Sequence, residues 1–118
     1  MKISKKNIQA CLTKDGSLIR ELMHPDMNGS INLSFAEAEI EPGQATDLHR
    51  HVLSEEIYHV SRGEGMMTLG TERFPIHPGD TICIYPGTPH RVENSGNEPL
   101  QILCCCAPPY SHSDTEIL

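Results

Sequence analysis

The sequence predicts an all-β protein, a small barrel or sandwich of short antiparallel strands. The first observation behind this prediction is that its apolar runs are short. The second is that turn-forming residues separate these runs at close intervals, with nine glycines and nine prolines among 118 residues. Many short strands with turn signals between them are typical of all-β barrels and sandwiches.

The runs that we interpret as strands follow one another from residue 30 to residue 106. In the first run, Ala36, Ala38 and Ile40 alternate with glutamates, which is typical of a strand with one buried face. Between the runs, Gly, Pro, Asn and Asp supply a positive φ or hold φ near about −65°, as tight turns require. The expected strands are residues 30–40, 46–52, 56–61, 66–69, 73–77, 81–85, 90–93 and 100–106.

The length favours one domain, residues 1–118, whose barrel core spans about residues 30–106. The first thirty residues are less regular, and residues 17–29 are compatible with either a short strand or a turn of helix. The tail, residues 107–118, contains two prolines and is expected to be an ordered arm or a loose end.

Charge and hydropathy limit the kinds of molecule that the protein is expected to bind. The formal net charge is −7 and no basic stripe is present, which argues against nucleic-acid binding and against anionic membranes. No apolar run approaches a transmembrane length, and no apolar segment of a signal peptide follows the first residues. We therefore expect a cytoplasmic protein whose partner is a small molecule.

The five cysteines do not form a C-x-x-C pair, so a zinc knuckle is not expected. Neighbours on a strand point to opposite faces, so either Cys105 or both Cys104 and Cys106 face inward. The first interpretation of these residues is small buried hydrophobes, and the second is a catalytic or ligand role.

The stretch HRHVLSEEIYHV, residues 49–60, is where chemistry is expected. Alternation along a strand puts His49 and His51 on one face, a tight turn returns Glu56 beside them, and His90 opens a later strand. Three imidazoles and one carboxylate suit Mn, Fe, Ni, Cu or Zn. On its own, the i, i+2 pair favours two solvated or core-edge histidines over a metal site.

The spacing around these residues resembles the two signature motifs of the cupin superfamily. From Gly43, five residues precede His49, one separates it from His51, four precede Glu56 and six precede Gly63. From Gly79, five residues precede Tyr85-Pro86-Gly87, two more precede His90 and three precede Asn94. The resemblance covers residues 43–94 and plausible flanking strands.

The resemblance implies a double-stranded jelly roll, commonly dimeric, with one divalent transition metal (Mn, Fe, Zn or Ni) in its mouth. The implied ligands are His49, His51, Glu56 and His90. Glu55 competes for the carboxylate role, but the six-residue gap to Gly63 favours Glu56. The chain departs from the motif in placing Tyr85 where proline is usual.

Two tyrosines are candidates for handling a proton at such a site. Tyr58 is expected to share the inward face with Glu56, although packing in the core is an alternative, and Tyr85 is expected nearer the mouth. Of the arginines, only Arg20 is expected to be able to reach the mouth.

Three functions remain open at this stage. The first is a metalloenzyme, such as a metal-dependent isomerase, lyase or dioxygenase, that acts on a small polar or anionic metabolite such as a sugar or hydroxy acid. The C-terminal segment also resembles short cupins described as sugar-phosphate-isomerase-like. The second is a ligand-binding or sensor barrel without turnover. The third is a barrel without a metal, against which the presence of all four implied ligands argues.

Overall fold

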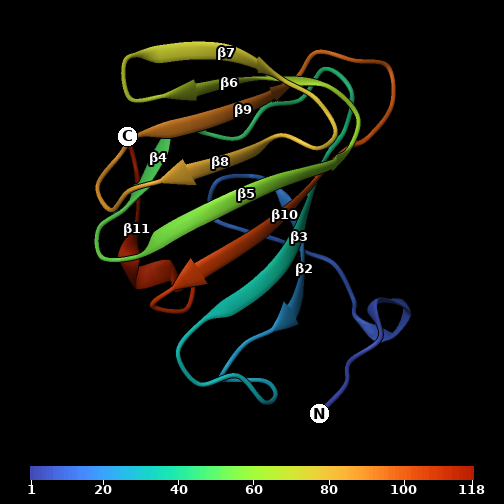
Figure 1. Ribbon diagram of the computed structural model, residues 1–118, viewed down its shortest axis with the longest axis vertical. Helices are drawn as coiled ribbons and strands as arrows, with labels where there is room; N and C mark the ends of the chain where they lie inside the picture. Colours follow the sequence, from blue (N-terminus) through green and yellow to red (C-terminus); the bar gives the residue numbers. More distant parts are fainter.

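The computed structural model describes residues 1–118 and arranges them in two antiparallel sheets that face each other (Figure 1). The six-stranded sheet has the order β1-β2-β3-β10-β5-β8, and the five-stranded sheet has the order β11-β4-β9-β6-β7. This is the all-β jelly roll that was predicted, and the prediction is confirmed. No helix is long and apolar enough to span a membrane.

The bounds of the elements are as follows. The six-stranded sheet contains β1 (Cys11–Leu12), β2 (Leu18–Met23), β3 (Ser34–Ile40), β10 (Leu100–Ala107), β5 (Glu55–Arg62) and β8 (Thr81–Ile84). The five-stranded sheet contains β11 (Thr115–Ile117), β4 (His49–His51), β9 (His90–Asn94), β6 (Gly65–Leu69) and β7 (Glu72–Ile76). Two short 3-10 turns, η1 (Lys5–Asn7) and η2 (His112–Asp114), lie outside the sheets.

The space between the sheets changes in character from one end to the other. In the central strands, β3, β10 and β5, alternate residues point inward. At one end the inward residues are apolar, with Leu100 paired to Ile40 and Ile102 to Val60. At the opposite end Cys106 pairs with both Ser34 and Glu56. An apolar core therefore fills one end of the barrel and leaves a polar interior at the other.

The two ends of the chain extend the sheets beyond the core of residues 30–106 that the sequence indicated. β1 and β2 add to the edge of the six-stranded sheet, and β11 pairs with β4. Every residue of β2 is partly buried, so its sequence shows no apolar alternation. β11 has only three residues, too few for a periodic pattern. The irregular N-terminal arm and C-terminal tail thus contain strands that periodicity does not reveal.

The predicted strand at 46–52 is shorter in the structure, where β4 spans only His49–His51. Thr46 still bonds to β9 through its backbone N–H and the carbonyl of Val92. The next residue, Asp47, instead donates its N–H to the carbonyl of Asp15, 2.8 Å away. The ladder is interrupted there because the loop between β1 and β2 takes over the pairing.

The turn between β5 and β6 depends on Gly63. Its φ is +81°, in the left-handed region that favours glycine. A Cβ at this position would lie 2.5 Å from the carbonyl oxygen of Pro99 and 2.9 Å from the Cα of Leu100. Only glycine allows the segment before β10 to pass this close to the turn.

Candidate metal centre

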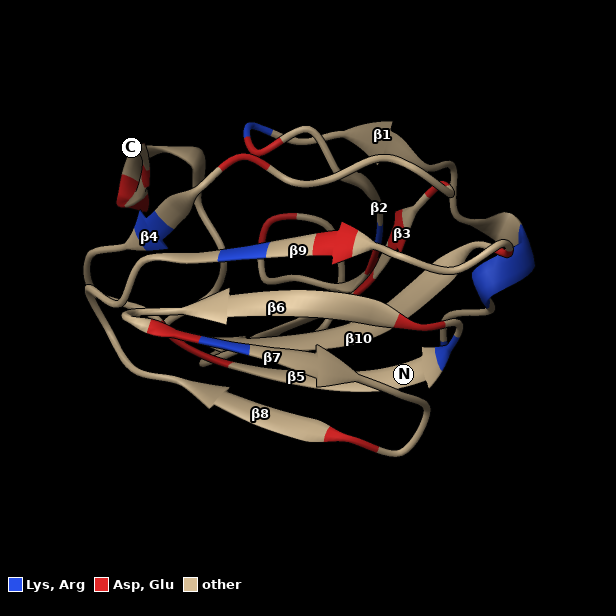
Figure 2. Cartoon of the chain, turned by 90° about the horizontal axis from the view of Figure 1, so that it is seen from above, with Lys and Arg blue, Asp and Glu red and all other residues tan.

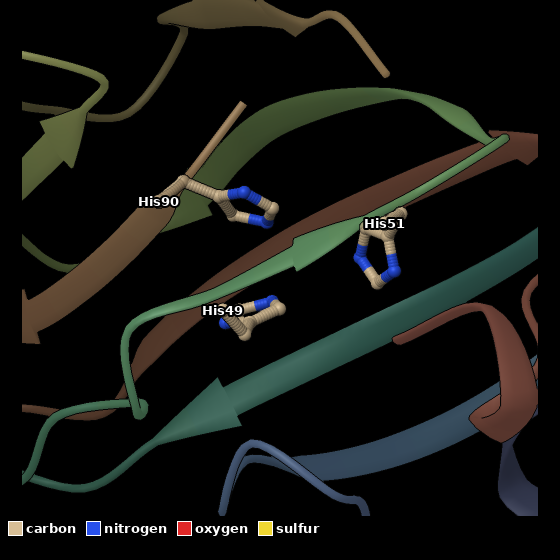
Figure 3. A group of neighbouring side chains, drawn as sticks. All are labelled: His49, His51 and His90. Carbon is tan, nitrogen blue, oxygen red and sulfur yellow. The ribbon is translucent and has the colours of Figure 1, made fainter. Parts of the chain in front are cut away.

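Three histidines converge inside the polar end of the barrel (Figure 3). His49 and His51 project from β4, and His90 projects from the first position of β9, directly opposite His49 in the ladder. One ring nitrogen from each lies within 4.8 Å of the others, and all three side chains are buried. This is the i, i+2 pair of the sequence, completed by the predicted third imidazole.

Each ring is oriented by a hydrogen bond at Nδ1. The Nδ1–H of His49 donates to the carbonyl of Asp47 at 2.7 Å, and that of His90 donates to the carbonyl of Thr88 at 2.9 Å. The third ring, His51, lies 3.0 Å from the hydroxyl of Thr115. Since carbonyl oxygens accept only, the Nδ1 atoms of His49 and His90 carry the protons. Their Nε2 lone pairs then face the cluster, as in metal-ligating histidines.

Glu56 reaches the histidines from the opposite sheet. Its Oε1 lies 3.2 Å from Nε2 of His51 and 3.5 Å from Nε2 of His90. Its Oε2 accepts a hydrogen bond from the thiol of Cys106 at 3.0 Å. The competing carboxylate, Glu55, is exposed on the outer face of β5. The structure therefore brings Glu56, and not Glu55, to the imidazoles.

Two atoms of this cluster have no hydrogen-bond partner although they are buried: Oε1 of Glu56 and Nε2 of His90. Buried polar atoms are almost always paired, so two unpaired atoms that face each other are suited to holding an ion between them. Donors bound at 90° to one transition-metal ion lie about 3 Å apart. The separations of 3.2 Å and 3.5 Å are close to that value, so the residues fit a metal ion.

Burial and neighbouring charges set the ionisation of the cluster. Burial disfavours the charged form of Glu56, but His51 and His90 outweigh it and lower the pKa of this carboxyl to about 2. Burial, followed by the charge of His90, lowers the pKa of His49. Burial also acts to lower the pKa of His51, but the Glu56 carboxylate outweighs it and raises that pKa. At neutral pH the cluster therefore contains an ionised carboxylate.

A fifth ionisable side chain, Asp15, enters the cluster from the loop between β1 and β2. Its Oδ2 lies 3.3 Å from Nε2 of His49, and the side chain is 12 % exposed. Sequence analysis missed this residue because it sits in an ordinary Asp-Gly turn, far from the motif in sequence. No local pattern marks it.

The centre opens into a cavity whose lining contains no lysine or arginine. Arg20 was expected to be able to reach the mouth, but β2 turns it outward, where it lies 3.7 Å from Glu37. The ionisable and hydroxyl-bearing residues of the lining include Asp15, Glu21, Glu56, Ser17, Ser34, Thr46, Tyr58, Tyr110 and Thr115. Basic residues are instead scattered along strands such as β4, β7 and β9 (Figure 2).

The two tyrosines differ in position. Tyr58 lines the cavity, is 7 % exposed and packs edge-on against His90 with ring centroids 5.8 Å apart. Burial, and next the charge of Glu56, raises its pKa well above the usual value, so it is a neutral phenol. Tyr85 follows β8, is 67 % exposed and does not line the cavity. The geometry therefore gives no support to a proton-handling role for Tyr85, because its side chain is exposed and outside the cavity lining.

The alternation of side chains along β10 decides which of the three consecutive cysteines face inward. Cys104 and Cys106 face inward and line the cavity, and Cys105 faces outward. Burial, and next the charge of Glu56, raises the pKa of the Cys106 thiol, which keeps it protonated. The thiol is thus a hydrogen-bond donor that holds Oε2 of Glu56 and leaves Oε1 to face the imidazoles.

Comparison with known proteins gives the following matches. A family model described as the cupin domain matches residues 36–106. An uncharacterised protein of Methanocaldococcus jannaschii is 54 % identical over 121 residues, which cover 100 % of this chain and 97 % of that protein. The oxalate-binding protein of Thermotoga maritima is 36 % identical over 58 % of this chain and 57 % of its own length. Among solved structures, a sugar phosphate isomerase from Silicibacter pomeroyi superimposes with a TM-score of 0.78 at 20 % identity, covering 91 % of this chain and 75 % of that one.

Proposed function

The chain belongs to the cupin family, and from that premise we propose that it holds one divalent transition-metal ion and acts with it on a small, neutral, hydroxylated metabolite. The proposed ligands are His49, His51, Glu56 and His90. The observation that carries the proposal is the pair of buried, unpaired acceptors, Oε1 of Glu56 and Nε2 of His90, at the meeting point of three oriented imidazoles.

The proposed donor atoms favour a metal ion that is intermediate between hard and soft. Three imidazole nitrogens and a carboxylate suit Mn, Fe, Zn or Ni, and cellular availability decides among ions that one site can bind. A divalent ion held here supplies Lewis-acid polarisation of a ligand oxygen, which promotes isomerisation or lyase chemistry. This non-redox chemistry is the form of the proposal that the cavity supports best, since its lining supplies hydroxyl and carboxylate groups for proton handling.

Tyr58 is the proposed hydrogen-bond donor to the bound metabolite. It lines the cavity beside His90, and its raised pKa keeps the phenolic proton in place. A phenol held neutral by burial donates a hydrogen bond to a ligand oxygen and supplies a proton as charge develops there.

The charge of the cavity favours a neutral ligand over a dianion. A phosphorylated or dicarboxylate ligand is normally held by arginine or lysine, and the lining has neither. It has three carboxylates instead, those of Asp15, Glu21 and Glu56. Burial raises the pKa of Glu21, with the charges of His24 and Glu56 acting in opposite directions. Hydroxyl groups of a sugar or polyol match these acceptors without bringing further negative charge.

The metal half of the proposal is tested by titrating metal-free, untagged protein with Mn²⁺ in a calorimeter. We expect one site per chain, and at least about a ten-fold loss of affinity in His90→Ala, since that variant removes a ligand. The matched control is His77→Ala, because His77 lies in a turn with its side chain 56 % exposed. Equal affinity in His90→Ala and His77→Ala, or no binding by the unaltered protein, would overturn the site.

The ligand half is tested on Mn²⁺-loaded protein with a panel of neutral sugars and polyols beside oxalate and a sugar phosphate. We expect stabilisation by a neutral member and none by the two anions, read as a shift in melting temperature. Proton NMR of the stabilising compound, under air and under argon, then detects chemical change. A compound that binds and stays unchanged would identify a binding protein, and preference for the anions would contradict the charge argument.

We also propose that two copies associate through the outer face of the six-stranded sheet. Four outward side chains lie side by side there, since Cys105 pairs with both Phe35 and Ile57, and Ile57 pairs with Cys83. Phe35 and Ile57 are 37 % and 43 % exposed. An apolar row across four strands is unusual for a surface in contact with water and is suited to a self-complementary interface.

A further inference from the structure

We propose that Asp15 is a fifth protein ligand of the metal ion, supplied by the loop between β1 and β2. The proposal rests on the proposed metal function and extends it to a residue outside the two histidine motifs. It concerns Oδ2 of Asp15, which faces Nε2 of His49.

The position of this oxygen is that of a metal ligand. Oδ2 of Asp15 lies 3.3 Å from Nε2 of His49, and Oε1 of Glu56 lies 3.2 Å and 3.5 Å from Nε2 of His51 and His90. Neighbouring donors on one ion are about 3 Å apart when their bonds are about 2.1 Å long. Each of the three imidazoles thus has a carboxylate oxygen at the separation expected for adjacent ligands.

The loop holds Asp15 in this orientation. Its other oxygen, Oδ1, accepts hydrogen bonds from the hydroxyl of Thr13 at 2.9 Å and from the backbone N–H and hydroxyl of Ser17 at 3.0 Å and 2.6 Å. Its carbonyl accepts the N–H of Asp47, two residues before His49. Three donors on Oδ1 fix the plane of the carboxylate and leave Oδ2 directed at the imidazole.

A cation would relieve the contact between Asp15 and His49. The Nδ1–H of His49 donates to the carbonyl of Asp47, so the neutral ring presents a lone pair at Nε2. Two lone pairs facing each other at 3.3 Å repel, and the side chains are only 12 % and 2 % exposed, which leaves little water to separate them. A metal ion held by the imidazoles would remove this repulsion if Oδ2 of Asp15 joined its ligands.

A fifth ligand changes what the centre can bind. Two carboxylates balance the charge of a divalent ion, so the loaded centre has no net charge to attract an anion. With five protein donors, the ion would have fewer positions left for a metabolite than with four. This agrees with a neutral hydroxylated ligand and disfavours chelation by two carboxylates.

The test compares Asp15→Asn with the unaltered protein and with Asp26→Asn, a control whose side chain is 88 % exposed. In Asp15→Asn the amide oxygen can keep the hydrogen bonds of Oδ1, and the NH₂ group that replaces Oδ2 cannot ligate. We expect Mn²⁺ affinity to fall at least about ten-fold and the visible absorption of the Co²⁺-loaded protein to change in intensity. Asp26→Asn should match the unaltered protein in both.

Two outcomes separate the hypotheses. If the unaltered protein binds Mn²⁺ and Asp15→Asn has the same affinity and the same Co²⁺ spectrum, Asp15 is not a ligand and the proposed function stands. If the unaltered protein binds no metal, the proposed function itself fails. Should Asp15→Asn not fold, a crystal structure of the unaltered Mn²⁺-loaded protein decides: Oδ2 within about 2.2 Å of the ion supports the proposal, and beyond about 3 Å overturns it.

Discussion

One hydroxyl group controls how His51 is presented to the cluster. The hydroxyl of Thr115 donates to the carbonyl of Ser111 at 2.9 Å, so it accepts the Nδ1–H of His51. That acceptor selects the tautomer whose Nε2 lone pair faces Glu56. Tyr110 packs edge-on against the same ring, with centroids 5.8 Å apart, and limits its rotation. A residue on the last strand thus sets the orientation of a proposed ligand on β4.

We predict that Thr115→Val weakens Mn²⁺ binding about ten- to a hundred-fold, because His51 loses the acceptor that fixes its ring. Thr115→Ser, which keeps the hydroxyl, should retain most of the affinity. Calorimetric titration of the metal-free variants provides the measurement. An unchanged affinity in Thr115→Val would show that the ring is held by packing alone.

At the residue scale, local spacing along the sequence was sufficient to predict some residues of the site but not the others. His49, His51, Glu56 and His90 could be predicted because strand alternation and turn length set their directions within short segments. Asp15, Thr115 and Cys106 could not, because each reaches the site through a pairing between segments far apart in the sequence. Tyr85 was misplaced for the opposite reason: its nearness to the motif says nothing about which way a turn residue points.

At the scale of elements, the turn between β5 and β6 is a point of close backbone contact. It must let the segment before β10 pass beneath it, since Leu100 lies against the turn and pairs with Ile40 at the start of the core. Gly43, at the end of the turn after β3, has a similar φ of +80° but nothing within 4 Å of its Cβ position. Substituting each of the two glycines therefore distinguishes the cost of a positive φ from the cost of a steric clash.

We predict that Gly43→Ala costs about 1–2 kcal/mol, the strain of placing an L-residue in the left-handed region. Gly63→Ala should cost at least about 3 kcal/mol, because its Cβ also meets backbone atoms that cannot move independently. Urea unfolding monitored by circular dichroism measures both. Equal losses in the two variants would mean that the backbone around Pro99 yields to the added methyl group.

Strand prediction succeeded where one face is buried and the other is in water. In β3, Ala36, Ala38 and Ile40 point inward as their alternation indicated. Glu37, on the other face, is nonetheless buried, because Lys5 of η1 lies 2.9 Å from its carboxylate. Contacts made by the N-terminal segment are absent from any local pattern, and for that reason β1 was not identified and β2 stayed open between a strand and a helical turn.

At the scale of the whole molecule, the proposed pairing of two copies concerns the outer face of the larger sheet. The row of Phe35, Cys105, Ile57 and Cys83 crosses β3, β10, β5 and β8 without a charged side chain. The inner face of the same sheet carries the core and the cavity. Association through the outer face therefore leaves the inward site residues in place.

We predict that the unaltered protein has about twice the mass of its 13.1 kDa chain in solution, and that Ile57→Glu has the single-chain mass. The glutamate places a charge in the middle of the apolar row, where it would be desolvated in the pair. The control is Leu118→Glu, which adds the same charge beside the five-stranded sheet. Light scattering after size exclusion measures both, and a single-chain mass for the unaltered protein would rule out the pair.

The pairing of β11 with β4 has a consequence for how the proposed metal site is assembled. The atoms that shape the centre come from Asp15, β4, β5, β9, β10 and Thr115, so the contacts that assemble it span 100 residues of chain. Long-range closures of this kind form late in folding, because loop entropy must be overcome before they contribute. A nascent chain that has not yet paired β11 has a loosely held His51. We therefore expect the proposed metal to be captured after folding, unlike in zinc fingers, where the ion drives folding. The ion would then be one available in the compartment where the barrel closes.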